Sequence, residues 1–271
     1  MLMNLRMKQS VHLLNKRQKI WQSKKIIKTL YHKWYRTIKA NLNPGLILEI
    51  GGGSGNLKEF FPHEISSDRL LVPWLDAVLD AHDLPVKDES LDNIVLFDVL
   101  HHLMEPVQFF FEAQRVLKQN GRIILMEPYI SRASFLIYKF LHSEGLSWNV
   151  DPFKTKFSKK NKNHFNGNQA IPTLMFEKYI NRFAANFPGL KIIKQERIDF
   201  VVYPLSGGFH NPSLCPQFLY PVLEYLEKLL HPQARHPALL SRPQGDRADV
   251  RVEDGLEFVG DAGDSALPGS G

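Results

Sequence analysis

Three glycines at alternate positions, Gly51, Gly53 and Gly55, directly follow a short apolar run at residues 46–50. Glycine has no Cβ, so such a turn lets the backbone pass close to a bound ligand. A phosphate-binding loop would continue with Gly-Lys-Ser or Gly-Lys-Thr, but Gly55 is followed by Asn56. A dinucleotide-binding turn needs its third glycine three positions after the second, where this chain has that same asparagine. The turn therefore predicts a ligand site that is neither a Gly-Lys-Ser/Thr phosphate-binding loop nor a dinucleotide site for hydride transfer.

Acidic side chains stand where the following apolar runs end. They are Asp68, Asp80, Asp98 and Glu127. In an open α/β sheet, ligands bind at the carboxyl ends of the parallel strands. We therefore expect these four carboxylates and the glycine turn to lie along one rim of a sheet.

The elements that would position these residues follow from the hydrophobic pattern. Strands are predicted at residues 46–50, 64–70, 77–81, 93–97, 122–126 and 190–202. Helices are predicted at residues 10–40 (one or two), 56–61, 106–118, 176–187 and 217–230. The connection at residues 70–76 is too short for a full crossover helix. Alternation of strands and helices predicts an α/β fold with helices on both faces of an open sheet.

Several sequence segments appear in a characteristic order. After Glu49 and the glycine turn come Asp68, Leu79-Asp80-Ala81-His82-Asp83-Leu84-Pro85, Ser90-Leu91-Asp92-Asn93-Ile94-Val95, Asp98-Val99-Leu100-His101-His102-Leu103 and Arg115-Val116-Leu117-Lys118-Gln119-Asn120-Gly121-Arg122. This succession resembles the methyltransferase type 11 family of class I S-adenosylmethionine-dependent methyltransferases. The resemblance implies a Rossmann-like open, mostly parallel sheet and S-adenosyl-L-methionine as the cofactor.

The resemblance also implies a role for each of these residues. Gly51, Gly53 and Gly55 would let the backbone pass under the methionine part of the cofactor, and Glu49 would orient the turn or the cofactor's amino group. Asp68 would accept hydrogen bonds from the ribose hydroxyls. Asp80 and the Ala81 backbone would meet the adenine edge. Taken singly, Asp68 and Asp80 are equally well explained as turn-forming residues.

A methyl group on a sulfonium is already activated, so the protein mainly aligns the acceptor in line with it and excludes water. His102 is our first candidate for a general base, and Asp98 is the second. The alternative is that one histidine of the His101-His102 pair only hydrogen-bonds to the backbone. Tyr129 is a candidate for shaping the acceptor pocket. No metal is expected at this site.

The nature of the acceptor follows mainly from missing motifs. Enzymes that methylate the exocyclic amino groups of bases carry an Asn/Asp-Pro-Pro-Tyr/Phe motif, but residues 97–100 are Phe-Asp-Val-Leu. Cytosine C5 methylation needs a cysteine nucleophile that follows a proline, whereas Cys215 precedes its proline. These differences favour a small molecule, a sugar or a lipid-linked compound, with residues 135–148 and 203–209 as acceptor walls. The alternatives are a nucleic-acid methyltransferase guided by a basic N-terminal segment, although nucleic acid is disfavoured, and a catalytically silent binding module.

Charge is unevenly distributed in the chain of 271 residues. Eleven lysines and arginines and no Asp or Glu precede Glu49. Such a segment could contact an anionic membrane surface, nucleic acid or a phosphorylated substrate, although a solvated helical face is the simpler explanation and the one we prefer. We predict a basic helical extension at residues 1–43, a methyltransferase domain at 44–233 with a lid or acceptor insertion at 129–175, and a disordered tail at 234–271.

The composition bears on the compartment. Cys215 is the single cysteine, so an intramolecular disulfide is excluded, which suits a reducing compartment. No apolar stretch approaches the ~20 residues needed to cross a bilayer, and the N-terminus lacks the pattern of a secretory signal. We expect a cytoplasmic protein. A mitochondrial transit peptide is the second possibility, because the first 48 residues contain no Asp or Glu, although they are rich in Lys and poor in Ser. The sequence does not indicate the oligomeric state.

Overall fold

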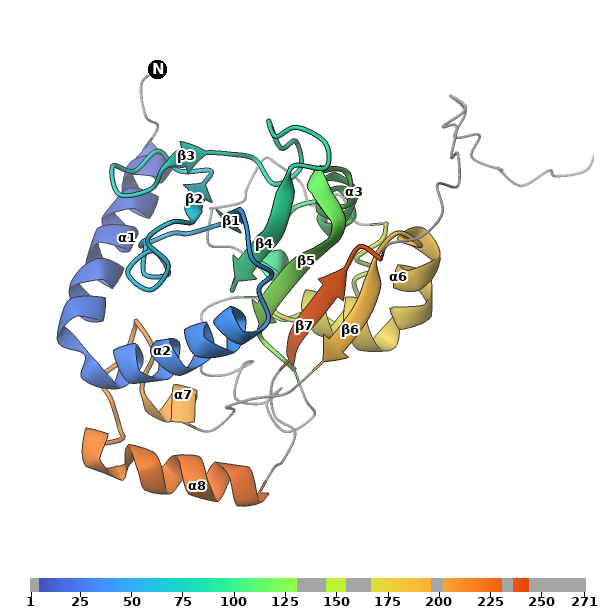
Figure 1. The fold of residues 1–271 in the computed structure, drawn as a ribbon. Helices are drawn as coiled ribbons and strands as arrows, with labels where there is room; N and C mark the ends of the chain where they lie inside the picture. The colour runs from blue at the N-terminus through green and yellow to red at the C-terminus, as the bar shows by residue number, and fades with distance from the viewer. Residues whose placement is uncertain (1–4, 131–144, 155–166, 196–201, 231–235, 244–271) are drawn as a thin grey trace, which may run out of the picture.

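A computed structural model describes residues 5–130, 145–154, 167–195, 202–230 and 236–243 (Figure 1). Over these residues the chain forms one seven-stranded sheet in the order β3-β2-β1-β4-β5-β7-β6. The strands are β1 (Ile47–Ile50), β2 (Ile65–Asp68), β3 (Ala77–Val78), β4 (Leu91–Phe97), β5 (Leu117–Glu127), β6 (Lys191–Gln195) and β7 (His236–Ser241). Strands β1 to β5 pair in parallel, whereas β7 runs antiparallel to both neighbours. The predicted open, mostly parallel sheet is confirmed.

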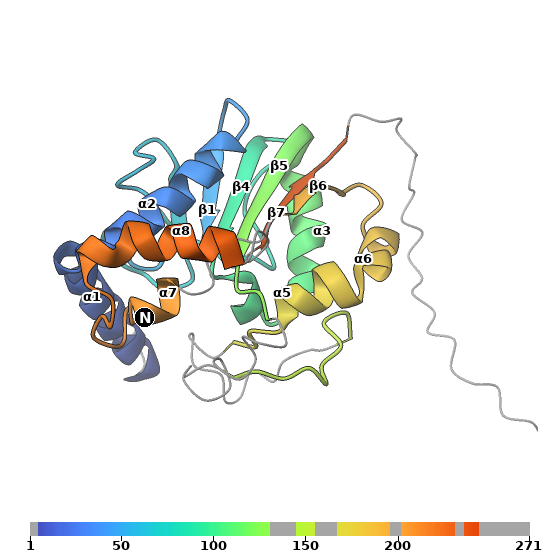
Figure 2. The same ribbon diagram turned by 90° about the horizontal axis from the view of Figure 1, so that it is seen from below.

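Helices cover both faces of this sheet, as predicted. They are α1 (Leu5–Ser23), α2 (Lys25–Ala40), α3 (Pro106–Val116), α5 (Ile171–Thr173), α6 (Ile180–Asn186), α7 (Val202–Leu205) and α8 (Tyr220–Leu230), with a π-helix η2 (Leu174–Lys178) and 3₁₀ turns η1 (Leu100–His102) and η3 (Gln217–Leu219). Figure 2 shows α2 and α8 on one side of the strands and α3 and α6 on the other.

Alternate residues of the central strands feed two separate cores, because successive side chains of a strand point to opposite faces. Ile94 and Leu96 of β4 pack with Phe109 and Phe110 of α3. Val95, between them, packs in the other core, with the buried side chains of α2. The strands that carry the predicted rim are therefore fixed from both sides.

The N-terminal helices are part of this second core. Helix α2 buries one face, formed by Ile26, Ile27, Leu30, Tyr31, Trp34, Tyr35 and Ile38. Burial of each large apolar side chain contributes about 1.5–3 kcal/mol. The opposite face carries the exposed basic residues Lys25, Arg36 and Lys39. The basic segment is thus solvated on one side only, and its other side covers the sheet.

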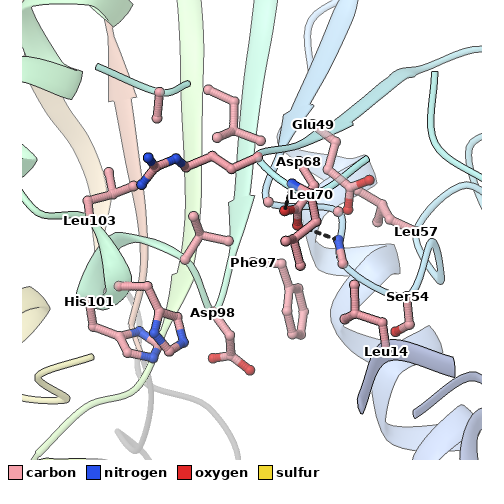
Figure 3. Close-up of a pocket in the computed structure, with 18 of the residues that line it drawn as sticks. Leu14, Glu49, Ser54, Leu57, Asp68, Leu70, Phe97, Asp98, His101 and Leu103 are labelled. Carbon is pink, nitrogen blue, oxygen red and sulfur yellow. Dashed lines mark hydrogen bonds between the residues drawn. The ribbon is translucent and has the colours of Figure 1, made fainter. Parts of the chain in front are cut away.

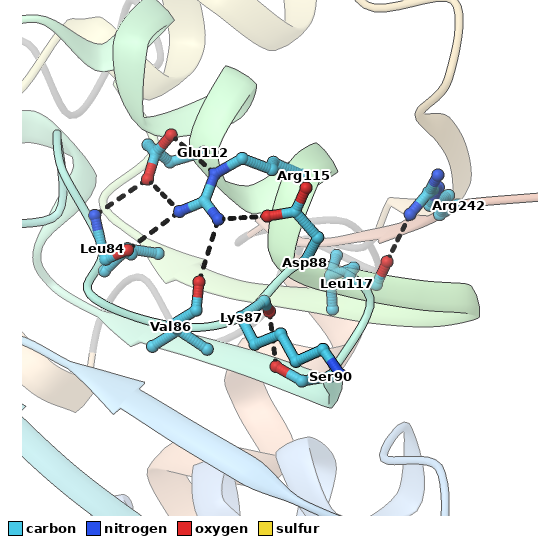
Figure 4. Close-up of polar contacts among 9 residues, drawn as sticks. All are labelled: Leu84, Val86, Lys87, Asp88, Ser90, Glu112, Arg115, Leu117 and Arg242. Carbon is cyan, nitrogen blue, oxygen red and sulfur yellow. Dashed lines mark hydrogen bonds and ion pairs between the residues drawn. The ribbon is translucent and has the colours of Figure 1, made fainter.

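A clamp built on Arg115 holds the short connection between β3 and β4 (Figure 4). Its guanidinium donates to the carbonyl oxygens of Leu84 and Val86 at 2.8 and 2.9 Å and forms ion pairs with Asp88 and Glu112 at 2.6 Å. The hydrogen bond from Arg115, its charge and a hydrogen bond from the Leu84 N–H keep the pKa of the Glu112 carboxyl below its usual value, although burial opposes the effect. The chain just before Leu84 forms one end of the site described below.

The predicted tail is wrong at its beginning, because residues 236–241 form β7 between β5 and β6. Pro237 obscured this strand, since proline cannot donate to a sheet ladder. In the sheet, Pro237 pairs with Met126 of β5.

Other boundaries also differ from the sequence predictions. Residues 53–60 form hydrogen-bonded turns rather than a helix at 56–61, because a single turn of helix is too short to overcome its nucleation cost. The helix predicted at 176–187 begins earlier, at Ile171, and includes the π-helix η2. Of the strand predicted at 190–202, residues 191–195 form β6 and Val202 begins α7, whereas residues 196–201 lie outside the described residues. The aromatic wall at 135–148, the lid within 129–175 and the tail after residue 243 lie largely or entirely outside the described residues.

No helix in the described part of the chain combines the length and the apolar character needed to cross a membrane.

Candidate functional site

A cavity of about 560 Å³ opens at the carboxyl ends of β1 to β4 (Figure 3). Of the residues predicted from sequence, the following line it: Glu49, Gly51, Gly53, Asp68, Asp80, Ala81, Asp98 and His102. Gly55 and Tyr129 do not. The structure therefore brings most of the predicted positions into one space, although their roles stay predictions.

The glycine turn needs its glycines for steric reasons. Gly51 has φ +76°, and a Cβ there would lie 2.4 Å from Cγ2 of Val99. Gly55 has φ +74° and backs onto Trp74, whose indole nitrogen donates to the Gly53 carbonyl at 2.9 Å. Gly55 thus shapes the turn from outside the cavity.

Asp68, at the end of β2, is bonded to this turn. One carboxylate oxygen accepts the Gly53 N–H at 3.1 Å, and the other accepts the Leu70 N–H at 2.9 Å. A carboxylate oxygen has two lone pairs, so each of these oxygens can accept a further hydrogen bond. Asp68 is half-buried and lines the cavity, which leaves it able to meet a ligand.

Asp80, after β3, forms a second polar anchor. His82 donates to its carboxylate from the backbone at 3.1 Å and from Nδ1 at 2.5 Å, while His82 Nε2 accepts the Glu105 N–H at 3.1 Å. Burial raises the pKa of Asp80, but the hydrogen bonds from His82 and the charge of Arg69, 3.5 Å away, outweigh it and lower the pKa below its usual value. Asp80 is therefore ionised at neutral pH.

Glu49 and Glu64 form a buried acidic pair beneath the glycine turn. Their side chains lie close enough to affect each other's pKa, and both pKa values are raised, to about 8 for Glu64, with burial as the largest cause. Among the described residues, Glu49 Oε2 and the Glu64 carboxyl oxygens meet no well-formed hydrogen bond. Glu49 also lines the cavity. The charge of Lys58 lowers both pKa values but does not offset the effect of burial, so the pair is a buried acceptor site whose charge is only partly balanced.

The loop after β4 is held by Glu127, the last residue of β5. One Glu127 oxygen accepts the N–H groups of Val99 and Leu100 at 2.7 Å, and the other bonds to His101 Nδ1 at 2.7 Å. His101 Nε2 lies 3.2 Å from Gln169 Nε2. Both ring nitrogens of His101 therefore have partners, which makes it a positioning residue.

His102 and Asp98 face the cavity beside this anchored histidine. Asp98 has φ +55°, a conformation that is strained for a residue with a Cβ and is often found at functional sites. Figure 3 shows its carboxylate beside His101. The rings of His101 and His102 are 4.1 Å apart between centroids. Fixing one ring thus limits the movement of the other.

Several lining residues come from segments that the sequence did not connect with the site. Leu14 and Arg17 of α1, Tyr31 and Tyr35 of α2, and Arg69 line the cavity. Gln18 of α1 ties the helix to the glycine turn through a 3.0 Å hydrogen bond to the Ser54 carbonyl. The amphipathic pattern predicted these helices, but no sequence signal indicates which part of the sheet they cover.

The predicted wall at residues 203–209 does reach the cavity, which Tyr203, Phe209 and His210 line. The centroid of the Tyr31 ring lies 5.0 Å from that of Phe97 and 5.5 Å from that of Phe209. Burial, aided by the charge of Asp98, raises the pKa of Tyr31 well above its usual value, so this phenol stays neutral. One end of the cavity is therefore polar and the other is mainly aromatic.

Comparisons with known proteins agree with this architecture. Residues 48–125 match the methyltransferase domain family. An uncharacterized protein of Methanocaldococcus jannaschii is 27% identical over 188 residues, which are 66% of this chain and 86% of that protein. The demethylmenaquinone methyltransferase of Thermotoga maritima is 29% identical over 131 residues, which are 40% of this chain and 57% of that protein.

A solved structure shares the fold. It is a chain of the complex that contains the Haloferax volcanii Trm112 methyltransferase activator, with a TM-score of 0.51, 12% identity, and coverage of 90% of this chain and 100% of that chain. At this identity the likeness concerns the fold alone. The family match shows that residues 48–125 form a methyltransferase domain of the type 11 family, and the fold shared with the solved structure extends over 90% of this chain.

Proposed function

We propose that this protein transfers a methyl group from S-adenosyl-L-methionine to a small molecule, a sugar or a lipid-linked compound. The observation that carries the proposal is the single cavity that joins the glycine turn, Asp68 and Asp80 to Asp98 and His102. A cofactor spread over the first group would present its methyl group to an acceptor near the second. The aromatic end of the cavity suits an acceptor with apolar surface.

The lining residues fit this cofactor at each of its polar groups. The acidic pair of Glu49 and Glu64 is only partly balanced by Lys58 and has buried oxygens without a well-formed hydrogen bond, and the cofactor's α-ammonium would supply a second cation and donors. The ribose hydroxyls would donate to Asp68, whose oxygens each have an unused lone pair. Asp80, held by His82, and the Ala81 backbone would meet the adenine edge.

Arg17 is our candidate partner for the cofactor's carboxylate. It lies on α1 between Leu14, which approaches Gly53, and Gln18, which bonds to Ser54. Its guanidinium lines the cavity and lies over the Phe209 ring, 6.0 Å from the ring centroid, so it would reach a carboxylate placed between the glycine turn and the aromatic end. A guanidinium matches the geometry of a carboxylate and can bind both of its oxygens.

Bound S-adenosyl-L-methionine supplies a methyl group on a positively charged sulfur. This methyl group would be open to in-line displacement by an acceptor oxygen, with the sulfur leaving with the electron pair of the carbon–sulfur bond. His102 or Asp98 would take the acceptor's hydroxyl proton, which is worth roughly 10²- to 10⁴-fold in rate. The hydrogen bond from His101 to Glu127 would keep His102 in place. Water is kept out by Tyr31, Phe97 and Phe209.

Transfer of a labelled methyl group tests the proposal. The protein is incubated with S-adenosyl-L-methionine carrying the label and with a cell extract divided into water-soluble small molecules, lipids and RNA. We expect label in the small-molecule or lipid fraction, and less than a tenth of it when His102→Asn and Asp98→Asn are combined. Label confined to RNA would favour the nucleic-acid alternative. Cofactor binding without transfer to any fraction would favour a silent module.

A further inference from the structure

Large apolar side chains are exposed together on and just before α8. Of the twelve exposed large apolar side chains in the described residues, six lie between residues 214 and 226. They are Leu214 (79% exposed), Phe218 (76%), Leu219 (39%), Val222 (54%), Tyr225 (63%) and Leu226 (44%), and we name them the α8 apolar surface. Contiguous apolar exposure of this kind marks an interaction site.

The fold itself does not need this surface, because α8 is anchored by its other side. Tyr220 is buried in the core formed with α2, and Leu223 packs against that core. Glu224 forms an ion pair with Lys33 of α2 at 2.8 Å. It is also the only charged residue in the sequence from 211 to 226. The outer side of α8 is therefore left apolar and uncharged through Leu226.

Basic side chains flank the α8 apolar surface. Helices α2 and α8 lie side by side in both views (Figures 1 and 2). Lys25 and Arg36 of α2 are exposed. On a helix, Arg36 neighbours Lys33, the residue that pairs with α8. Lys25 follows Lys24, whose amine bonds to the carbonyls of Gly208 and Asn211 in the chain before α8. An apolar strip with a basic edge complements an anionic lipid surface, where apolar groups enter the acyl boundary and cations meet the headgroups.

We propose that the α8 apolar surface, with Lys25 and Arg36 at its edge, docks the protein on an anionic lipid bilayer. The chain between α7 and α8 supplies both this surface and the cavity wall, because Phe209 and His210 line the cavity and Leu214 lies four residues further on. Lys24 ties the same chain to the N-terminal helices through hydrogen bonds to the carbonyls of Gly208 and Asn211, at 2.7 and 2.8 Å. Docking would thus hold the aromatic end of the cavity close to lipid.

Sedimentation with lipid vesicles tests the docking, and it is measured on the full chain without cofactor, so its result does not depend on the proposed methyl transfer. Vesicles of equal parts phosphatidylcholine and phosphatidylglycerol are compared with vesicles of phosphatidylcholine alone. We expect binding to the anionic vesicles, weaker binding at high salt, and at least about tenfold weaker binding to the neutral vesicles.

Two sets of variants separate the apolar and the charged contributions. Phe218→Ser, Val222→Ser and Tyr225→Ser together should weaken binding at least about tenfold, whereas Leu71→Ser, which removes an equally exposed leucine (71%) elsewhere, should not. Lys25→Glu with Arg36→Glu should weaken binding to anionic vesicles. Lys87→Glu, on the exposed loop before the amino end of β4, should not.

Two results would overturn the proposal. One is binding to anionic vesicles that the triple serine variant retains in full. The other is a wild-type protein that does not bind vesicles and is a dimer in light scattering, while the triple serine variant is a monomer. The α8 apolar surface would then join two copies of the chain. Circular dichroism of every variant confirms that the fold is kept.

Discussion

Replacing Glu64 with glutamine should change how stability depends on pH. The pKa of Glu64 is raised from 4.5 to about 8, first because the side chain is buried, so the folded protein holds a proton that the unfolded chain has already lost. Between these two pH values the unfolded state binds fewer protons, and the free energy of unfolding therefore falls as pH rises. The contribution of Glu64 is complete below pH 4.5 and is lost once pH passes about 8.

The size of the effect follows from the same pKa. Each tenfold change in proton affinity is worth about 1.4 kcal/mol, so the rise to about 8 sets an upper limit of about 5 kcal/mol. Relaxation and water penetration lower the cost of a buried charge, and we expect a loss of roughly 2–4 kcal/mol between pH 5.5 and 8.5. Glu64→Gln has no proton to lose and should be more stable than the wild type by that amount at the upper pH.

Urea unfolding at half-unit pH steps measures this difference. Glu59→Gln is the matched control, because Glu59 lies on the same segment but is exposed and pairs with Lys28 at 3.4 Å. Surface pairs of this kind contribute about 0–1 kcal/mol, so the control should follow the wild type. Parallel pH profiles for Glu64→Gln and the wild type would refute the buried acidic pair.

Three further substitutions test the turn, the clamp and the base. Gly51→Ala should lower the free energy of unfolding by about 1–3 kcal/mol in urea, because its Cβ would meet Val99 at 2.4 Å and φ is +76°, and unchanged stability would contradict the turn geometry. A lysine in place of Arg115 cannot bridge two carbonyls and two carboxylates at once, so Arg115→Lys should lower the free energy of unfolding by roughly 1–2 kcal/mol. It should also weaken cofactor binding in calorimetry. Full retention of both stability and binding would count against the clamp. His102→Asn should lower kcat by roughly 10²- to 10⁴-fold on a hydroxyl acceptor without weakening cofactor binding, and an unchanged kcat would exclude it as the base.

The strands and the rim of the site could be predicted because their signals are local. Apolar runs such as residues 93–97 form strands buried on both faces, and the glycines of the turn are required by the backbone itself. Since parallel strands end at one edge, Asp68, Asp80 and Asp98 could be placed together before the fold was known.

The missing parts depend on contacts between distant segments. The pattern of α2 predicts a helix, but its position over β4 and the cavity follows from packing of Tyr31 and Trp34 on Phe97, which no local rule supplies. Strand β7 was hidden by Pro237 and by a change of composition after residue 234. Glu64 gives no sequence signal either, because an isolated glutamate is normally exposed.

Titration calorimetry with S-adenosyl-L-methionine and S-adenosylhomocysteine tests the central claim most directly. We expect both to bind with micromolar affinity, NADH not to bind, and binding of the first two to be lost in Asp68→Ala and strongly weakened in Glu49→Gln, which leaves the ammonium without a full negative charge. Glu59→Gln, outside the cavity, should bind as the wild type does. Wild-type affinity in both Asp68→Ala and Glu49→Gln, or no binding to the wild type, would contradict the cofactor site.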